Sequence, residues 1–255
     1  MRLHGKVAIV TGAGGGIGSA TARRFAEEGS MVACVDVDAT TAAAAADAVE
    51  AAGGQAIAVA ADVSTRDGNH QMVEETVARF GGLDVLHANA AVQVMGRIED
   101  TTEDDWDTLE TTNLRGVYLG VQQALPRLRE RGGGSIIVTA SLLGIVGDPE
   151  MPAYGAMKGG LRALCRALAA AHGPENIRCN TICPGDVETP MNAQFFDHQA
   201  DPAAARAEVA SRYPLRRFAS PEDVANVAVF LASDEASYLN GIDIVVDGGL
   251  LARIY

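Results

Sequence analysis

The stretch Thr11-Gly12-Ala13-Gly14-Gly15-Gly16-Ile17-Gly18 decides the fold class of this chain. It follows an apolar run over residues 7–11, which is typical of a buried strand, and it opens a helix-like stretch over residues 17–28. Glycines at such a turn permit a tight backbone and let a pyrophosphate approach the positive end of a helix. The stretch therefore predicts a nucleotide site at the first turn of a βαβ unit.

The spacing of these glycines is Thr-Gly-x-x-x-Gly-x-Gly, through Gly12, Gly16 and Gly18. It is not the strict GxGxxG fingerprint, because the last glycine of that pattern would fall at position 17, which is isoleucine. A glycine cluster alone is weak evidence for nucleotide binding. Its position between a strand and a helix is what strengthens the interpretation.

Short Val- and Ile-rich runs alternate with Ala-rich helical stretches along the chain. We expect strands at 7–11, 31–36, 56–60, 84–88, 135–139, 178–183 and 244–246. We expect helices at 17–28, 40–52, 68–80, 102–131, 153–172 and 221–231. Strands that are apolar on both faces are typical of a parallel sheet covered by helices. The chain is thus predicted to be one α/β domain over residues 1–255: a Rossmann fold with a doubly wound, seven-stranded parallel sheet and helices on both faces.

One region breaks this alternation, at about residues 190–214, where the composition is mixed. Insertions of this length often act as lids over a binding site. We therefore expect this segment to be a substrate lid.

The bulk composition excludes several classes of function. The formal net charge of −13 argues against nucleic acid as a partner, because phosphate binding needs clustered Lys and Arg. No apolar run is long enough to cross a bilayer, and the N-terminus lacks a signal-peptide layout, so we expect a cytoplasmic protein with no membrane partner. The four cysteines and five histidines show no metal-ligand spacing, so no metal is expected.

Asp36 ends the second predicted strand, 18 residues after Gly18. A carboxylate at this place accepts hydrogen bonds from the adenosine ribose hydroxyls and repels a 2′-phosphate. No Lys or Arg in the glycine loop or at Val37 would neutralise such a phosphate. NAD is therefore favoured over NADP, although Asp36 could also be only a loop cap.

Tyr154 and Lys158 are four residues apart in a predicted helix, so they share one face. A phenol has a pKa of about 10 in the absence of neighbours. A lysine charge beside it favours the phenolate and would bring its pKa toward the range that acid–base catalysis needs. Pairs at this spacing are also common on solvated helices, so the pair is informative only together with the glycine turn.

With these pieces in place, the chain resembles the short-chain dehydrogenase/reductase family along nearly its whole length. The glycine turn is similar to the family's cofactor loop, and Val246-Asp247-Gly248-Gly249 to its C-terminal signature. The resemblance implies that the catalytic residues are Asn113, Ser141, Tyr154 and Lys158. It implies that the cofactor-binding residues are Gly12, Gly16, Ile17, Gly18, Asp36, Asp62, Val63, Asn89, Tyr154, Lys158, Pro184, Gly185, Val187 and Thr189.

The chain departs from the family pattern after the fourth strand. The family's Asn-Asn-Ala-Gly reads here as Ala88-Asn89-Ala90-Ala91. Ala88 lacks the first amide, and Ala91 adds a methyl where the backbone can pass close to the cofactor. We expect the fold to tolerate both changes.

The roles implied by the resemblance form a proton and hydride path. Ser141 would hold the substrate oxygen near Tyr154, and Tyr154 would take the alcohol proton while a hydride leaves for NAD⁺. Lys158 would lower the pKa of Tyr154 and bind the nicotinamide ribose. Asn113 would anchor a water that links Lys158 to solvent.

The expected walls of the substrate pocket are residues 92–95, 142–151 and 191–196, which are mostly apolar. No Arg or Lys in these segments is placed to clamp an anion, so a neutral secondary alcohol or ketone, cyclic or polyol-like, is the favoured small-molecule substrate. Two alternatives remain: a 3-oxoacyl-[acyl-carrier-protein] reductase that uses NADPH, and a catalytically silent NAD-binding sensor.

Assembly is predicted from helices 102–131 and 153–172, which carry apolar residues on more than one face. In relatives the equivalent helices pair across subunits, so the resemblance implies a homotetramer. Burial of these side chains inside one subunit is the alternative. The side chains concerned are Trp106, Leu109, Val117, Leu161, Leu164 and Leu168.

Overall fold

The computed structural model of the chain describes residues 1–197 and 199–252. Seven parallel strands form one sheet in the order β3-β2-β1-β4-β5-β6-β7. The strands are β1 Val7–Thr11, β2 Met31–Asp36, β3 Gln55–Ala60, β4 Val85–Ala88, β5 Gly134–Thr139, β6 Ile177–Pro184 and β7 Asp243–Val246. This confirms the predicted doubly wound fold.

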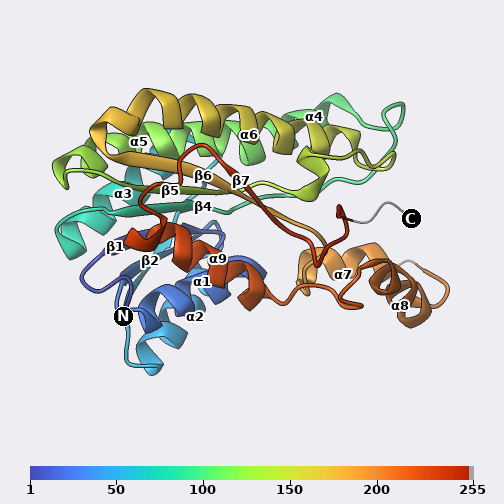
Figure 1. Cartoon of the computed structure of the whole chain (residues 1–255), viewed down its shortest axis with the longest axis horizontal. Coiled ribbons are helices and arrows are strands. Elements are labelled where there is room, and N and C mark those ends of the chain that lie inside the picture. Colours follow the sequence, from blue (N-terminus) through green and yellow to red (C-terminus); the bar gives the residue numbers. More distant parts are fainter. Residues whose placement is uncertain (198, 253–255) are drawn as a thin grey trace.

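Helices cover both faces of the sheet, as Figure 1 shows. One apolar cluster joins the sheet to α1, α2 and α9, and a second joins it to α3, α5 and α6. The helices are α1 Gly16–Glu27, α2 Ala39–Ala51, α3 Arg66–Phe80, α4 Glu103–Leu109, α5 Gly116–Glu130, α6 Pro152–His172, α7 Pro190–Asp197, α8 Pro202–Arg212 and α9 Pro221–Ala232. Short 3-10 turns lie at η2 Leu142–Gly144, η3 Gly173–Glu175 and η4 Asp234–Ala236.

The predicted helix over residues 102–131 is in fact three segments. Between α4 and α5 the chain forms a π-helix, η1 Glu110–Arg115. A π turn widens the helix by one residue and often lies at a functional site. Nothing in the composition of this stretch distinguishes it from an ordinary helix.

The region at 190–214 holds two helices, α7 and α8, that the sequence did not predict. Both begin with proline, and Asp201 caps α8 by accepting a hydrogen bond from the Ala204 amide at 3.0 Å. They enclose a small apolar cluster of their own around Phe196, Tyr213 and Phe218. Figure 1 shows the pair standing beyond one end of the sheet.

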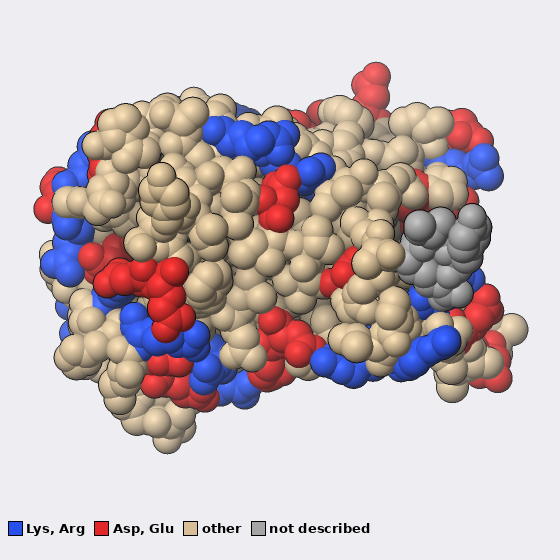
Figure 2. Space-filling view, in the orientation of Figure 1, with Lys and Arg blue, Asp and Glu red and all other residues tan. Residues whose placement is uncertain are grey.

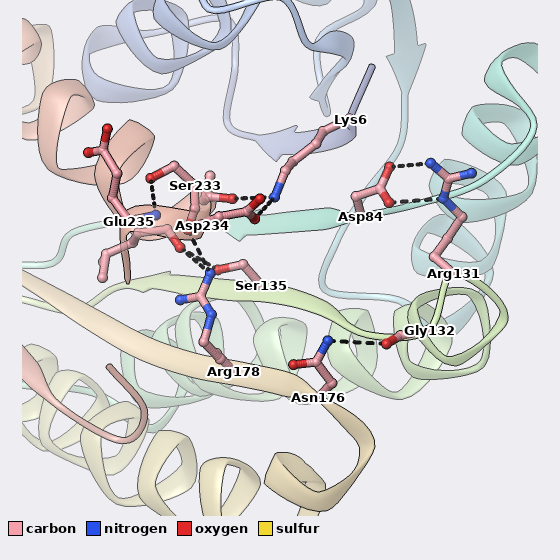
Figure 3. Close-up of polar contacts among 12 residues, drawn as sticks. Lys6, Asp84, Arg131, Gly132, Ser135, Asn176, Arg178, Ser233, Asp234 and Glu235 are labelled. Carbon is pink, nitrogen blue, oxygen red and sulfur yellow. Dashed lines mark hydrogen bonds and ion pairs between the residues drawn. The ribbon is translucent and has the colours of Figure 1, made fainter. Parts of the chain in front are cut away.

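Polar contacts fasten the edge of the molecule around the start of the strands (Figure 3). The Arg131 guanidinium donates to Asp84 at 2.9 and 3.2 Å, and Arg178 donates to the Leu231 and Ser233 carbonyls at 2.8 and 3.2 Å. Lys6 pairs with Asp234 at 2.7 Å. These contacts tie loops to the edge of the sheet where the strands begin, opposite the edge where they end.

Three of the apolar side chains considered for a subunit interface, Leu109, Val117 and Leu161, are buried within the subunit. Trp106 is 42% exposed. On the face shown in Figure 2, basic side chains lie beside acidic ones, and neither sign forms one continuous patch. Within the described residues, no helix has both the length and the apolar character that spanning a membrane requires.

Candidate active site

A cavity of about 600 Å³ opens at the carboxyl edge of the sheet. Five strands deliver residues to its wall: Gly12 follows β1, Asp36 ends β2, Asn89 follows β4, Ser141 follows β5 and Gly185 follows β6. β1 lies between β2 and β4, so the strand order reverses beside the cavity. Ligands of open α/β sheets bind at such a switch point.

The glycine turn leaves bare backbone at one end of this cavity. A Cβ at Gly12 would lie 2.9 Å from the Ala90 Cα, and one at Gly18 would lie 2.0 Å from the Gly12 carbonyl oxygen. Gly12 and Gly16 also have positive φ values, of 65° and 37°. Only glycine fits these positions, and the turn it makes leads directly into α1, whose N-terminus favours an anion. The residues present therefore fit a dinucleotide.

Asp36 lies beside the same turn. Its carboxylate accepts hydrogen bonds from the Gly14 amide at 3.0 Å and the Asp38 amide at 3.2 Å. These contacts fix the side chain at the cavity wall. Asp36 therefore caps the loop, as the alternative interpretation has it. The same residue also lines the cavity.

Most of the predicted cofactor residues line the cavity. Those that do so are Gly12, Gly16, Ile17, Asp36, Asn89, Tyr154, Lys158, Pro184, Gly185, Val187 and Thr189. Gly18 lies behind the turn, where it allows the backbone to close. Asp62 and Val63 follow β3 outside the cavity wall, and the Asp62 carboxylate accepts from the Ser64 amide at 2.9 Å.

Tyr154 and Lys158 share one face of α6, as predicted, and both line the cavity. The Lys158 ammonium nitrogen lies 5.4 Å from the centre of the Tyr154 ring and donates to the Thr139 carbonyl at 2.9 Å. The lysine is only 2% exposed. The Tyr154 ring packs against the apolar cluster of Leu109 and Met157, which holds its orientation.

The pKa of Tyr154 is raised in this structure, whereas the spacing to Lys158 predicted that it would be lowered. Burial raises the pKa of Tyr154 to about 12, and an interaction with Ser141 only partly opposes the rise. Burial lowers the pKa of Lys158 to about 8. The prediction considered the charge but not the desolvation of both groups, and desolvation disfavours the charged form of each.

Ser141 begins the turn after β5 and is half-buried in the wall. Its hydroxyl oxygen accepts a hydrogen bond from the Leu143 amide at 3.1 Å. The hydroxyl hydrogen is not used in that bond. It is available to a substrate oxygen or to Tyr154.

Asn113 is fully buried in the π-helix and faces the loop after β4. Its amide oxygen accepts from the Val92 amide and its amide nitrogen donates to the Val92 carbonyl, both at 2.8 Å. The side chain thus pairs with Val92 as a strand would. Its direct effect is to hold the loop that carries the cavity residues Ala91 and Gln93.

A buried network joins the cofactor end to the lysine. The Asn89 amide nitrogen donates to the Thr11 carbonyl at 3.0 Å, and its oxygen accepts from the Thr139 hydroxyl at 3.1 Å. His87 contacts that hydroxyl at 2.9 Å. Burial lowers the pKa of His87 to about 3, so it is neutral at pH 7. Of the two departures from the family pattern, Ala88 packs in an apolar cluster and Ala91 lines the cavity.

The sequence predicted part of the substrate half of the cavity and missed the rest. Of the predicted walls, Gln93, Leu142, Leu143, Val146, Asp148, Met151, Met191, Asn192, Phe195 and Phe196 line it. Asp186, Val209, Arg212, Tyr213 and Leu250 line it as well. An arginine from outside the predicted wall segments, Arg212, is therefore present in the wall, and it pairs with Glu208 at 2.7 Å. The signal for Asp186 was its position directly after the Pro-Gly at the end of β6.

Comparison with known proteins identifies this arrangement. Residues 12–251 match a family model described as enoyl-(acyl carrier protein) reductase, one of the models of the short-chain dehydrogenases. The chain belongs to the short-chain dehydrogenase/reductase family. Members of this family bind nicotinamide cofactors, so the protein is a nicotinamide-dependent oxidoreductase.

Individual relatives of this short-chain dehydrogenase/reductase cover it from end to end. A meso-2,3-butanediol dehydrogenase of Serratia marcescens is 41% identical over 99% of this chain and 97% of its own. A 3-oxoacyl-[acyl-carrier-protein] reductase of Thermotoga maritima is 38% identical over 98% of this chain and all of its own. The crystal structure of levodione reductase superposes with a TM-score of 0.95, at 35% identity, over the whole of both chains.

Proposed function

We propose that the protein transfers a hydride between NAD(H) and a neutral secondary alcohol or its ketone. The observation that carries the proposal is one continuous cavity with a carboxylate, Asp36, at its glycine-turn end and the Ser141, Tyr154 and Lys158 side chains in its wall. The names of the butanediol dehydrogenase and the levodione reductase support an alcohol or cyclic ketone as substrate.

The cofactor preference follows from Asp36. Its carboxylate would accept hydrogen bonds from ribose hydroxyls and would repel a 2′-phosphate. The glycine turn and Thr189, whose side chain closes over Gly16, would hold the rest of the dinucleotide. Asp62 and Val63 would have to reach the adenine from outside the cavity wall.

The chain's own residues would manage the proton. The Ser141 hydroxyl donates to the substrate oxygen and holds it beside the Tyr154 hydroxyl. Tyr154 accepts the alcohol proton as a phenolate and becomes a neutral phenol. The charge of Lys158 stabilises that phenolate before the transfer. The bound oxidised cofactor supplies the hydride acceptor and a positively charged ring. We also assign Asn113 a water on the path from Lys158 to solvent, with its side chain kept in place by Val92.

The setting proposed for the enzyme is a cytoplasmic homotetramer. The four cysteines are buried as free thiols, which suits a reducing compartment. Trp106 and Tyr118, which are 42% and 47% exposed, supply apolar surface on α4 and α5 for a subunit contact. A monomeric mass in solution at micromolar concentration would contradict this assembly.

The function is tested by mixing the protein with NAD⁺ or NADP⁺ and a panel of secondary alcohols, and following the absorbance of the reduced cofactor. We expect turnover with NAD⁺ and a preference for it over NADP⁺. Reduction of a 3-oxoacyl thioester with NADPH, in preference to every ketone tested, would favour the carrier-protein reductase instead. Tight NADH binding without turnover of any substrate would favour the silent sensor.

A further inference from the structure

A carboxylate that takes no part in this chemistry faces the same cavity. Asp186 follows the Pro-Gly turn at the end of β6 and is half-buried in the wall. One carboxylate oxygen accepts a hydrogen bond from the Tyr213 hydroxyl at 2.7 Å. The same hydroxyl accepts from the Asp186 amide at 2.9 Å, so side chain and backbone are held together. No described residue donates a hydrogen bond to the other carboxylate oxygen.

The position of Asp186 is fixed rather than adaptable. Tyr213 is only 3% exposed and packs with Phe196 and Phe218 in the cluster under α7 and α8. The Asp186 carbonyl accepts from the Ala219 amide at 2.9 Å. A carboxylate that is held in this way can accept a further hydrogen bond with little loss of conformational freedom when a ligand binds.

The partly buried carboxylate of Asp186 also has few interactions that stabilise its negative charge. Burial raises its pKa, the nearby carboxylate of Asp148 raises it further, and the Tyr213 hydrogen bond and the charge of Arg206 oppose the rise. A partly desolvated carboxylate gains stability from each additional donor. A ligand group that donates to it would therefore be bound selectively.

The surroundings indicate which kind of donor this is. The cavity that Asp186 lines has a largely apolar wall, which includes Met151, Phe195 and Phe196. The charged groups are of both signs, since Arg212 lines the same cavity as Asp148 and Asp186. A fully charged ligand would meet a like charge on one side, whereas a neutral hydroxyl can donate to a carboxylate without that penalty.

We propose that Asp186 accepts a hydrogen bond from a second hydroxyl group of the substrate, and that the enzyme therefore selects diols over alcohols with one hydroxyl. This inference rests on the proposed function, because it concerns the substrate of that site. Tyr213 is the positioning residue that orients the carboxylate. The substrate class is then a diol, one hydroxyl of which is oxidised at Tyr154 while the other is held by Asp186.

The test compares cyclohexanol with cyclohexane-1,2-diol, cyclohexane-1,3-diol and cyclohexane-1,4-diol under NAD⁺. Wild-type protein is expected to show kcat/KM for at least one diol about 10-fold to 100-fold above that for cyclohexanol, the range for a hydrogen bond to a charged group. Asp186→Ala is expected to remove that advantage and to leave cyclohexanol oxidation within about threefold, because its reacting hydroxyl is held elsewhere.

Two further variants keep the result interpretable. Asp186→Asn retains the shape and an acceptor for Tyr213, and should lose only part of the advantage. Glu188→Gln removes the same charge two residues further along, on an exposed side chain outside the cavity wall, and should retain all of it. NADH titration by fluorescence and a thermal melt establish that each variant is folded.

The outcomes separate this inference from the proposed function. Equal kcat/KM for cyclohexanol and all three diols in wild-type protein would overturn the role of Asp186 while the alcohol dehydrogenase assignment stands. A diol advantage that persists in Asp186→Ala, or that Glu188→Gln also abolishes, would overturn it too. Failure of wild-type protein to oxidise any alcohol of the wider panel would overturn both.

Discussion

Lys158 offers the most quantitative prediction, because it is an ammonium buried in a site that must hold it charged. The perturbation is Lys158→Met, which keeps a side chain of similar length and removes the charge. Burial lowers the pKa of Lys158 from its ordinary value of 10.5 to about 8. Since each tenfold change in proton affinity is worth 1.36 kcal/mol, this difference corresponds to about 3 kcal/mol.

The sign of the effect follows from where the proton is bound. Below about pH 8 the native and unfolded chains both carry it, and folding bears the full cost of burying the charge. Between pH 8 and 10.5 the unfolded chain still binds the proton and the native chain does not, so native stability rises with pH. Wild-type protein should therefore gain about 3 kcal/mol relative to Lys158→Met across this window.

The assay is urea denaturation of both proteins from pH 7 to pH 10.5, with the difference in free energy of unfolding plotted against pH. Losing the hydrogen bond to the Thr139 carbonyl changes the difference in free energy of unfolding by the same amount at every pH. The burial of the charge is therefore measured by the slope of that difference against pH. The chain contains only two lysines, and Lys6→Met, at a partly exposed lysine paired with Asp234, controls for the loss of one positive charge. Parallel curves for wild type and Lys158→Met would refute the burial argument. So would an ε-carbon NMR titration of Lys158 with a midpoint near 10.5.

Three further predictions concern the cofactor end and the buried network. Asp36→Ser should lower NAD⁺ affinity by about 10-fold to 100-fold, because charged hydrogen bonds are lost, and raise the preference for NADP⁺; an unchanged ratio of the two kcat/KM values would contradict the assignment. Gly18→Ala should abolish NADH binding in a fluorescence titration, since its Cβ would lie 2.0 Å from the Gly12 carbonyl oxygen; wild-type affinity would show that the turn adapts. His87→Val should make the protein less sensitive to acid. Because the pKa of His87 in the folded chain is about 3, only the unfolded chain binds a proton at this position as the pH falls below 6.5. In urea denaturation, the free energy of unfolding of wild-type protein should therefore fall by about 3 kcal/mol more than that of the variant by pH 4. Equal losses would refute the neutral, buried histidine.

Much of the fold could be predicted because buried parallel strands have a simple signature. Val7–Thr11 and Met31–Asp36 were predicted to the residue, since both are short apolar runs bounded by turn residues. The helices α7 and α8 were missed because they pack in a small cluster with Tyr213 and Phe218, which a regular apolar pattern within each helix does not reveal.

The site was predictable where one motif carries the chemistry and not where several segments meet. The glycine turn, Tyr154 and Lys158 could be recognised from the sequence when they were taken together, and the cavity brings them into one wall. Asp186 was not predicted: its position after the Pro-Gly turn could be seen in the sequence, but its hydrogen bond with Tyr213 and its proximity to Asp148 could not. The same limitation explains the error about Tyr154: a sequence gives its neighbours on the helix but not the desolvation that raises its pKa.

The most direct test of the account is turnover by Tyr154→Phe, which removes one hydroxyl from the cavity and leaves the packed ring. With the best secondary alcohol of the panel and saturating NAD⁺, kcat should fall by about 10²-fold or more, as expected for the loss of a general acid–base group. NADH binding should stay within a few-fold of wild type, because the glycine turn and Asp36 are untouched. Turnover at the wild-type rate in this variant would contradict the central claim that the Tyr154 hydroxyl moves the substrate proton.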